Sequence, residues 1–129
     1  MPTINAYVEL SPEEKEAKKD YIDRHSPFIT VAKSAKAGEK LAVNVRLGKN
    51  YSHPDDTDHY INEIKLFDRE TLLATATLIS GINGGQGNKG QAEVTFFIVP
   101  NKNLKLTALS YCTKHGLWQS DPAEVEVVA

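Results

Sequence analysis

The side chains best suited to bind a transition metal are gathered in three short segments of this chain. All four histidines and the only cysteine fall there: His25 alone, His53 with His59, and Cys112 with His115. Imidazole nitrogens and thiolate sulfur are borderline or soft donors, which transition metals prefer. The Cys-x-x-His spacing lets a thiolate and an imidazole converge on one ion across a single turn. The sequence therefore predicts one metal site built from four imidazoles and one thiolate.

Each segment taken alone also fits a role without metal. A free cysteine such as Cys112 is often a small buried hydrophobe, and loop histidines such as His53 and His59 are often only solvated. Together, the five donors narrow the choice of metal, because structural zinc prefers four ligands and catalytic zinc three protein ligands plus water. Five protein ligands leave one octahedral position for a small molecule. That arrangement suits a mononuclear iron that cycles between Fe(II) and Fe(III).

The elements that must position these side chains are mostly strands. Residues 40–47 alternate polar and apolar side chains, which is typical of a half-buried strand. Similar runs separated by turn residues are expected at Pro27–Lys33, His59–Asp68, Leu72–Ile79, Gln91–Val99, Leu104–Tyr111 and Ala123–Val128. We therefore predict an all-β fold, an immunoglobulin-like antiparallel β-sandwich of about seven strands.

One short helix is expected before the first strand. Ser11 precedes Pro12, and Glu14 completes a Ser-x-x-Glu capping box, which is a pattern of helix starts. The run to about Tyr21 is charged nearly all round. It predicts a surface helix that delivers the chain to the segment with His25.

Composition sets the class of protein. A chain of 129 residues is expected to form a single domain over 1–129 that is large enough to bury a core. A net charge of −2 offers no basic field for nucleic acid or anionic membrane, and no run approaches the ~18 apolar residues of a membrane span. With one thiol and no apolar signal-peptide core at the start, a cytoplasmic location is expected.

Residues 85–90 match the GxGxxG pattern of dinucleotide sites. That pattern needs a strand before it and a helix after it. The residues that follow, Val94-Thr95-Phe96, are β-branched and aromatic, so a hairpin loop is predicted instead.

Four short motifs follow one another along the chain and identify a family. They are Asp23-Arg24-His25-Ser26-Pro27, His53-Pro54, His59-Tyr60-Ile61 and Cys112-Thr113-Lys114-His115-Gly116-Leu117-Trp118. The chain resembles superoxide reductases of the neelaredoxin type, the one-iron relatives of desulfoferrodoxin. That family carries Glu-Lys-His-x-Pro, His-Pro, His-x-Ile and Cys-Asn-x-His-Gly-Leu-Trp in this order. The multi-cysteine domain that desulfoferrodoxins add has no counterpart in a chain with one thiol.

The resemblance implies an iron with His25, His53, His59 and His115 in the equatorial plane and the Cys112 thiolate below it. Superoxide would take one electron at the open position and, with two protons, leave as hydrogen peroxide. Rubredoxin or a similar small electron donor would return the iron to the ferrous state. Single-domain relatives suggest a homo-oligomer, either a tetramer or a dimer.

Two residues beside His25 depart from the family pattern but are still expected at the catalytic site. Asp23 replaces a glutamate that can bind ferric iron, and its side chain is one methylene shorter. Arg24 replaces a lysine thought to attract superoxide and organise proton delivery. Arginine keeps the charge but does not release a proton near neutral pH. We therefore expect Arg24 to attract superoxide while a water relays protons.

Two other readings stay open at this level. A blue-copper electron-transfer protein also combines a β-sandwich with a cysteine–histidine loop, but such sites use two histidines, one cysteine and commonly a methionine. The only methionine here is Met1. The other reading is an immunoglobulin-like binding module without enzymatic activity, in which the histidines are incidental. Stoichiometric iron, copper or no metal in the purified protein separates the three.

Overall fold

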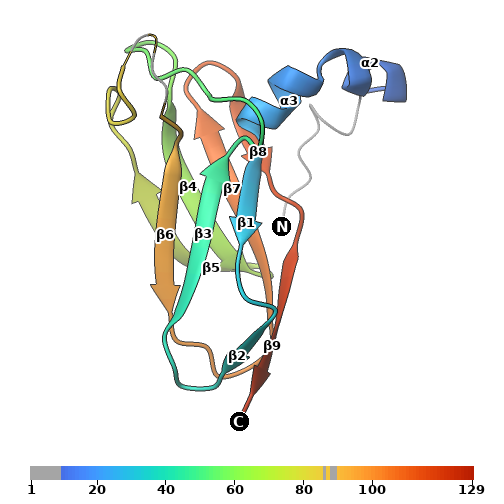
Figure 1. Ribbon diagram of the computed structural model, residues 1–129, viewed down its shortest axis with the longest axis vertical. Coiled ribbons are helices and arrows are strands. Elements are labelled where there is room, and N and C mark those ends of the chain that lie inside the picture. Colours follow the sequence, from blue (N-terminus) through green and yellow to red (C-terminus); the bar gives the residue numbers. More distant parts are fainter. Residues whose placement is uncertain (1–9, 86, 88–89) are drawn as a thin grey trace.

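Two β-sheets packed face to face make up most of the described part of the chain, with the helical segment of residues 12–25 at one end (Figure 1). The computed structural model describes residues 10–85, 87 and 90–129. The smaller sheet has the order β1 (Pro27–Thr30), β3 (Leu41–Leu47) and β6 (Glu93–Ile98), all antiparallel. The larger sheet has the order β2 (Ser34–Lys36), β9 (Ala123–Val128), β7 (Leu104–Cys112), β4 (Ile61–Asp68) and β5 (Thr71–Thr77), and β8 (Gly116–Gln119) pairs with β7. The predicted β-sandwich is confirmed.

The core lies between the sheets and follows the two-residue period of the strands. In β3, Leu41, Val43, Val45 and Leu47 are all buried, and the residues between them are not. Side chains from the facing sheet complete the core, including Ile61, Ile64 and Leu66 of β4 and Leu104, Leu106 and Ala108 of β7. Each leucine, isoleucine or valine among them contributes about 1.5–3 kcal/mol when it leaves water. Burial of this kind fixes the register of β3, since a shift by one residue would expose its four apolar side chains.

Two strands were not foreseen in the sequence. The described residues form nine strands rather than about seven, because β2 and β8 are added. Both have four residues or fewer, which is too short to show an alternating pattern. β2 also pairs with β9 in parallel, so the sandwich is not antiparallel throughout. β8 is the return strand of a hairpin and pairs with β7 directly after the turn that follows Cys112.

The N-terminal helical segment is divided in two. Helix α2 (Pro12–Ala17) has the predicted capping box: Ser11 Oγ accepts from the Glu14 amide at 3.1 Å, and the Glu14 carboxylate accepts from the Ser11 amide at 3.2 Å. At Lys18 the backbone leaves the helical conformation, with φ −107° and ψ 22°. A second helix, α3 (Lys19–His25), follows. The prediction of one helix ending near Tyr21 was therefore wrong, and His25 belongs to a helix. Among the described residues, neither helix is long and apolar enough to cross a bilayer.

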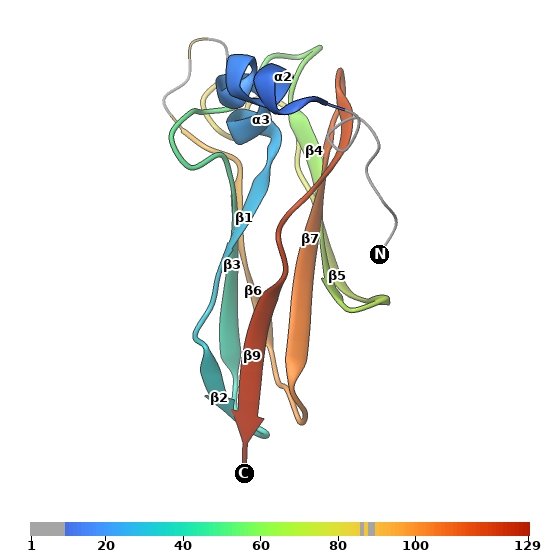
Figure 2. The ribbon, with the colours of Figure 1, turned by 90° about the vertical axis from the view of Figure 1, so that its right-hand side faces the viewer.

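The segments that carry the candidate ligands meet at one end of the sandwich. Figure 2 shows α3, the connection between β3 and β4, and the turn between β7 and β8 at the same end, opposite the C-terminus. Strand direction explains this gathering, because β3 and β7 end there and β4 begins there. Residues far apart in the sequence are thereby brought to one place.

Candidate metal centre

The end of α3 carries the first candidate ligand. His25 is the last residue of the helix and is only 1% exposed. Its Nδ1 lies 2.7 Å from the carbonyl oxygen of Tyr21, one turn earlier. Because a carbonyl only accepts, Nδ1 donates this hydrogen bond. The lone pair of His25 is therefore on Nε2, and the ring is held in one orientation.

The connection between β3 and β4 carries the next two candidate ligands, His53 and His59. Nδ1 of His53 lies 2.7 Å from the carbonyl oxygen of Pro54, so here too the free lone pair is on Nε2. His59 is placed by a turn in which the amides and carbonyls of Asp56 and His59 pair with each other at 3.0 and 3.1 Å. Nε2 of His59 is buried and finds no hydrogen-bond partner among the described residues. An unpartnered buried nitrogen is costly in a folded protein unless something else satisfies it.

The hairpin between β7 and β8 carries the remaining two candidate ligands, Cys112 and His115. Cys112 is fully buried and pairs with Gly116 across the hairpin, so His115 lies in the tight turn between them. Gly116 has a φ of +81°, a conformation that side chains with a Cβ rarely adopt. The amide of His115 points at the Cys112 sulfur, 3.3 Å away, which places a donor where a thiolate would need one.

The four imidazole rings stand at the corners of a square. Neighbouring rings, in the order His25, His53, His59, His115, have centroids 4.7–4.9 Å apart and planes at 75–88° to each other. His25 and His59 face each other across the square at 6.2 Å. The sulfur of Cys112 lies 3.2 Å from Nε2 of His53 and 3.7 Å from Nδ1 of His115, which occupy opposite corners. The sulfur therefore lies between two opposite corners of the square.

The possible ligand atoms converge on one centre. Those of His25, His53, His59 and Cys112 all lie within 4.8 Å of one another. The fifth, Nδ1 of His115, lies 3.1 Å from Nε2 of His25. The lone pairs on Nε2 of His25 and of His53 lie at this centre, and Nε2 of His59 has no hydrogen-bond partner there, which fits a bound cation. The structure thus brings together all five donors that the sequence singled out.

Burial sets the charge of these side chains. It lowers the pKa of His25 to about 4 and that of His53 to about 3, and the positive charges of neighbouring histidines add to the effect. The pKa of His59 is lowered for the same reasons. Burial raises the pKa of the Cys112 thiol, while the backbone amides of Lys114 and His115 oppose that rise. The site therefore offers His25, His53 and His59 as neutral imidazoles, the form that binds metal, and a thiol whose proton a cation would displace.

Asp23 and Arg24 lie on the same helix end but make contacts of their own. The Asp23 carboxylate accepts hydrogen bonds from the backbone amides of residues 49–51. The Arg24 guanidinium pairs with Asp20 at 3.5 Å and lies 5.9 Å from the centre of the Tyr51 ring. Its positive charge is one of the causes that lower the pKa of His25, so its field reaches the cluster.

Several supporting residues were missed or undervalued in the sequence. The Trp118 ring stacks on His25 with centroids 4.9 Å apart and planes at 24°, and Tyr21 packs edge-on against Trp118. Thr113 accepts from the amide of Tyr60 through its hydroxyl and donates its own amide to the Tyr60 carbonyl, both within 3.2 Å. These contacts hold His25 and His59 from outside the cluster. The aromatic residues gave no spacing signal, since packing partners depend on the fold.

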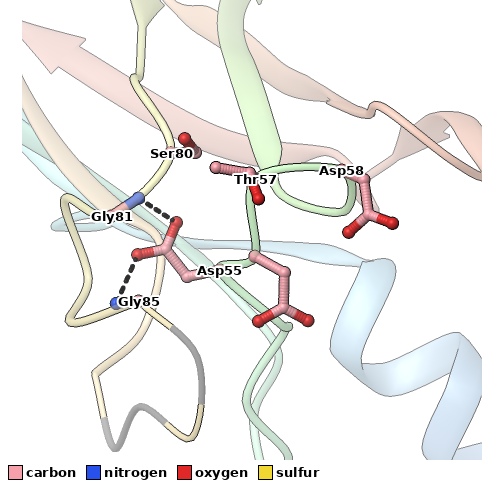
Figure 3. Close-up of a pocket in the computed structure, with 7 residues that line it drawn as sticks. Asp55, Thr57, Asp58, Ser80, Gly81 and Gly85 are labelled. Atoms are coloured by element: carbon pink, nitrogen blue, oxygen red, sulfur yellow. Dashed lines mark hydrogen bonds between the residues drawn. The ribbon is translucent and has the colours of Figure 1, made fainter.

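Asp55 is a further residue that the sequence did not mark. It is 3% exposed, and its carboxylate accepts from the amides of Gly81, Asn83 and Gly85 at 2.8–3.1 Å. Figure 3 shows the Asp55 side chain pointing into this loop, on the wall of a hollow. Gly85, the first glycine of the GxGxxG match, therefore binds a carboxylate of the protein itself.

A square of imidazoles with a buried sulfur beside them, at the end of a β-sandwich, defines this protein as a metal-binding protein of the histidine–cysteine class. The chain belongs to the desulfoferrodoxin family, whose family model matches residues 13–121. It is 32% identical over 101 residues to the superoxide reductase of Thermococcus kodakarensis, which covers 77% of this chain and 85% of that protein. Over 110 residues it is 30% identical to the superoxide reductase of Pyrococcus furiosus, covering 77% and 86%.

A solved structure and a further sequence relative agree with this assignment. The superoxide reductase (neelaredoxin) from Ignicoccus hospitalis superposes with a TM-score of 0.70 at 27% identity, over 91% of this chain and 93% of that one. The neelaredoxin of Megalodesulfovibrio gigas is 29% identical over 112 residues, which cover 78% of this chain and 86% of that protein. The resemblance read from the four motifs is thereby confirmed.

Proposed function

We propose that this protein is a superoxide reductase, which reduces superoxide by one electron to hydrogen peroxide. The observation that carries the proposal is the square of four imidazoles with the Cys112 sulfur between two of its opposite corners. The family resemblance implies that sulfur binds from one side of the square and that the other side is left for a small molecule. Membership of the desulfoferrodoxin family supports the same activity.

The metal that suits these residues is a single iron held by His25, His53, His59, His115 and Cys112. When bound, iron supplies the electron by changing between Fe(II) and Fe(III). The two outward hydrogen bonds, from His25 to Tyr21 and from His53 to Pro54, fix which ring nitrogen faces the centre. Four neutral imidazoles and one thiolate cancel only one of the two charges of Fe(II). The site therefore keeps a net positive charge that attracts an anion.

The residues around the cluster have separate tasks in this reaction. The Arg24 charge draws superoxide toward the site, because a fixed positive charge raises the local concentration of an anion. Arg24 does not release a proton near neutral pH, so both protons of the peroxide come from water. Burial of the cysteine and of two of the histidines keeps the centre in a low-dielectric setting where this attraction is strong.

A blue-copper carrier is the competing function, and the geometry disfavours it. Such a site needs two histidines and one cysteine, which would leave two converging imidazoles without a role. Measurement of the bound metal decides this point. Stoichiometric iron supports the reductase, and stoichiometric copper would favour the carrier.

Turnover needs an electron donor and an assembled protein. We infer that rubredoxin or a similar small one-electron carrier restores the ferrous state, and that the chain forms a tetramer or a dimer. Family resemblance supports both statements. Mass measured by light scattering after gel filtration, and re-reduction of the oxidised protein followed at its visible band, test them separately.

The reductase activity is tested by the yield of products. Protein loaded anaerobically with ferrous iron should consume one superoxide for each iron oxidised and release one hydrogen peroxide, with no dioxygen. A dismutase would instead release one hydrogen peroxide and one dioxygen for every two superoxide ions. Evolution of dioxygen in this ratio, or failure to bind one iron per chain, would contradict the proposal.

A further inference from the structure

The Asp23 carboxylate is already bound by backbone groups of another segment. Oδ1 lies 3.2 Å from the amide nitrogen of Lys49, and Oδ2 lies 3.0–3.1 Å from those of Lys49, Asn50 and Tyr51. Three consecutive N–H groups therefore converge on one half-buried carboxylate. Hydrogen bonds to an ionised acceptor are among the stronger ones in proteins.

These hydrogen bonds join two segments that each carry a metal-site histidine. Asp23 stands two positions before His25, and Tyr51 stands two positions before His53. The two segments also meet at Gly48, whose amide donates to the Ser26 carbonyl at 3.0 Å. The approach is so close that a Cβ at Gly48 would collide with the Tyr51 carbonyl oxygen. The relative position of two corners of the imidazole square thus depends on this junction.

Asp55 shows the same arrangement on the other side of His53. Its carboxylate also accepts three backbone N–H groups, from Gly81, Asn83 and Gly85. The segment before His53 therefore binds the Asp23 carboxylate. After His53, the Asp55 carboxylate binds the loop of residues 81–85. In both places a carboxylate is used to fix a loop.

We propose that Asp23 is a positioning residue, which holds the His53 segment against the end of α3 and does not leave its three amides to bind the metal. The proposal rests on the proposed metal centre. Asp23 moving to the metal would strand three N–H groups that have no other acceptor among the described residues. Its side chain is also one methylene shorter than the glutamate found at this place in the family motif.

Two variants of Asp23 separate an anchor from a ligand. Asp23→Asn keeps an oxygen that accepts from these amides, whereas Asp23→Ala removes it. We expect Asp23→Ala to raise the Kd for cobalt(II) on the order of tenfold, the usual effect of removing a residue that orients metal ligands. Asp23→Asn should stay close to the wild type. In the iron-loaded, oxidised protein, the visible band and its pH dependence should be the same in Asp23→Asn and the wild type.

Asp68 provides a matched control. Its carboxylate accepts from the Lys105 amide at 3.0 Å, and it lies at the end of β4 away from Ile61, which pairs with Cys112. Asp68→Ala therefore removes a similar anchor far from the metal centre. We expect it to lower stability without changing the Kd for cobalt(II).

Hydrogen exchange tests the anchor without any metal. In the metal-free protein, the amides of residues 49–51 should exchange faster in Asp23→Ala than in the wild type, and Asp23→Asn should restore most of the protection. Unchanged exchange in Asp23→Ala would overturn the proposal. So would a visible band in Asp23→Asn that shifts and loses its pH dependence, since that result assigns Asp23 to the metal. A wild-type protein that binds no iron would refute the proposed function alone, because this exchange experiment needs none.

Discussion

Nε2 of His53 lies 3.2 Å from the sulfur of Cys112, although 59 positions separate the two residues. His53 comes from the connection between β3 and β4, and Cys112 ends β7 in the larger sheet. The sulfur therefore comes to the imidazole square from the larger sheet. This relationship makes Cys112 the donor whose chemistry differs most from the others, and its loss should have a distinct spectral effect.

Cys112→Ser should keep the fold but change the metal centre. Serine is similar in size, yet its hydroxyl is a hard donor that stays protonated near neutral pH. We expect the sulfur charge-transfer band of the oxidised iron protein to disappear and the Kd for cobalt(II) to rise by about tenfold or more. Absorption spectra and metal titrations measure both effects.

Ser120→Ala serves as its control. Ser120 is buried and accepts from the Ala108 amide at 2.8 Å, so its loss weakens the same sheet without touching the cluster. An unchanged band and unchanged affinity in Cys112→Ser would show that sulfur does not bind the metal.

Arg24→Ala should slow the reaction with superoxide in a salt-dependent way. Removing one positive charge beside His25 weakens the attraction of an anion, and we expect the second-order rate constant to fall on the order of threefold at low salt. The difference should shrink at high salt because ions screen the charge. Pulse radiolysis at several ionic strengths measures this.

Lys40→Ala removes the same charge elsewhere. Lys40 lies over the Phe97 ring next to the start of β3, at the end of the sandwich away from the cluster, and its loss should leave the rate almost unchanged. If Arg24→Ala had the same rate and salt slope as the wild type, Arg24 would have no part in attracting superoxide.

The metal-free protein should lose stability as the pH falls below about 6.5. Burial lowers the pKa of His25 to about 4 and of His53 to about 3, whereas an unfolded histidine titrates near 6.5. Between these values the unfolded chain binds more protons than the folded one, so acid favours unfolding. The full free energy of unfolding is present above about pH 6.5. Below that pH it should fall by about 1.4 kcal/mol per pH unit for each histidine.

Urea unfolding between pH 5 and 6.5 checks this, since most carboxyl groups are still ionised there. His53→Asn removes one of these histidines, so the free energy of unfolding should depend less steeply on pH by the contribution of that one histidine. A free energy of unfolding that stays constant over this range would contradict the burial of these rings in the metal-free state.

The parts of this site that the sequence predicted are those with local signatures. Cys112 and His115 are three positions apart in one hairpin. The residue after them, Gly116, has a positive φ, which is the conformation that a glycine at this place indicates. The alternation of β3 and the capping box at Ser11 are local patterns as well, and both are confirmed. Such features depend on neighbours in the chain, which a sequence displays directly.

The parts that the sequence did not predict depend on contacts between distant segments. Nothing near Asp55 indicates that amides 26–30 positions later will bind its carboxylate. The break of the helix at Lys18 and the stacking of Trp118 on His25 are likewise settled by packing. β2 was missed because three residues carry no period, and its pairing with β9 is decided by the fold.

Gly116→Ala should disturb the metal centre through the backbone alone. Gly116 has a φ of +81°, and a Cβ there would meet no atom within 4 Å, so the substitution adds conformational strain without a clash. We expect a loss of stability of about 1–2 kcal/mol. Gly38 offers a matched comparison, since it has a φ of +80° and equally open surroundings, and it precedes β3 at the other end of the molecule. Gly38→Ala should cost a similar amount of stability.

The two variants should differ in metal binding. In Gly116→Ala, the backbone would relieve its strain by changing the geometry of the hairpin that carries His115 and Cys112. This change should raise the Kd for cobalt(II). Gly38→Ala should bind cobalt(II) like the wild type. Thermal unfolding and cobalt titrations of both proteins measure the two effects separately. Equal affinities in the two variants would mean that the hairpin geometry at Gly116 does not position the ligands.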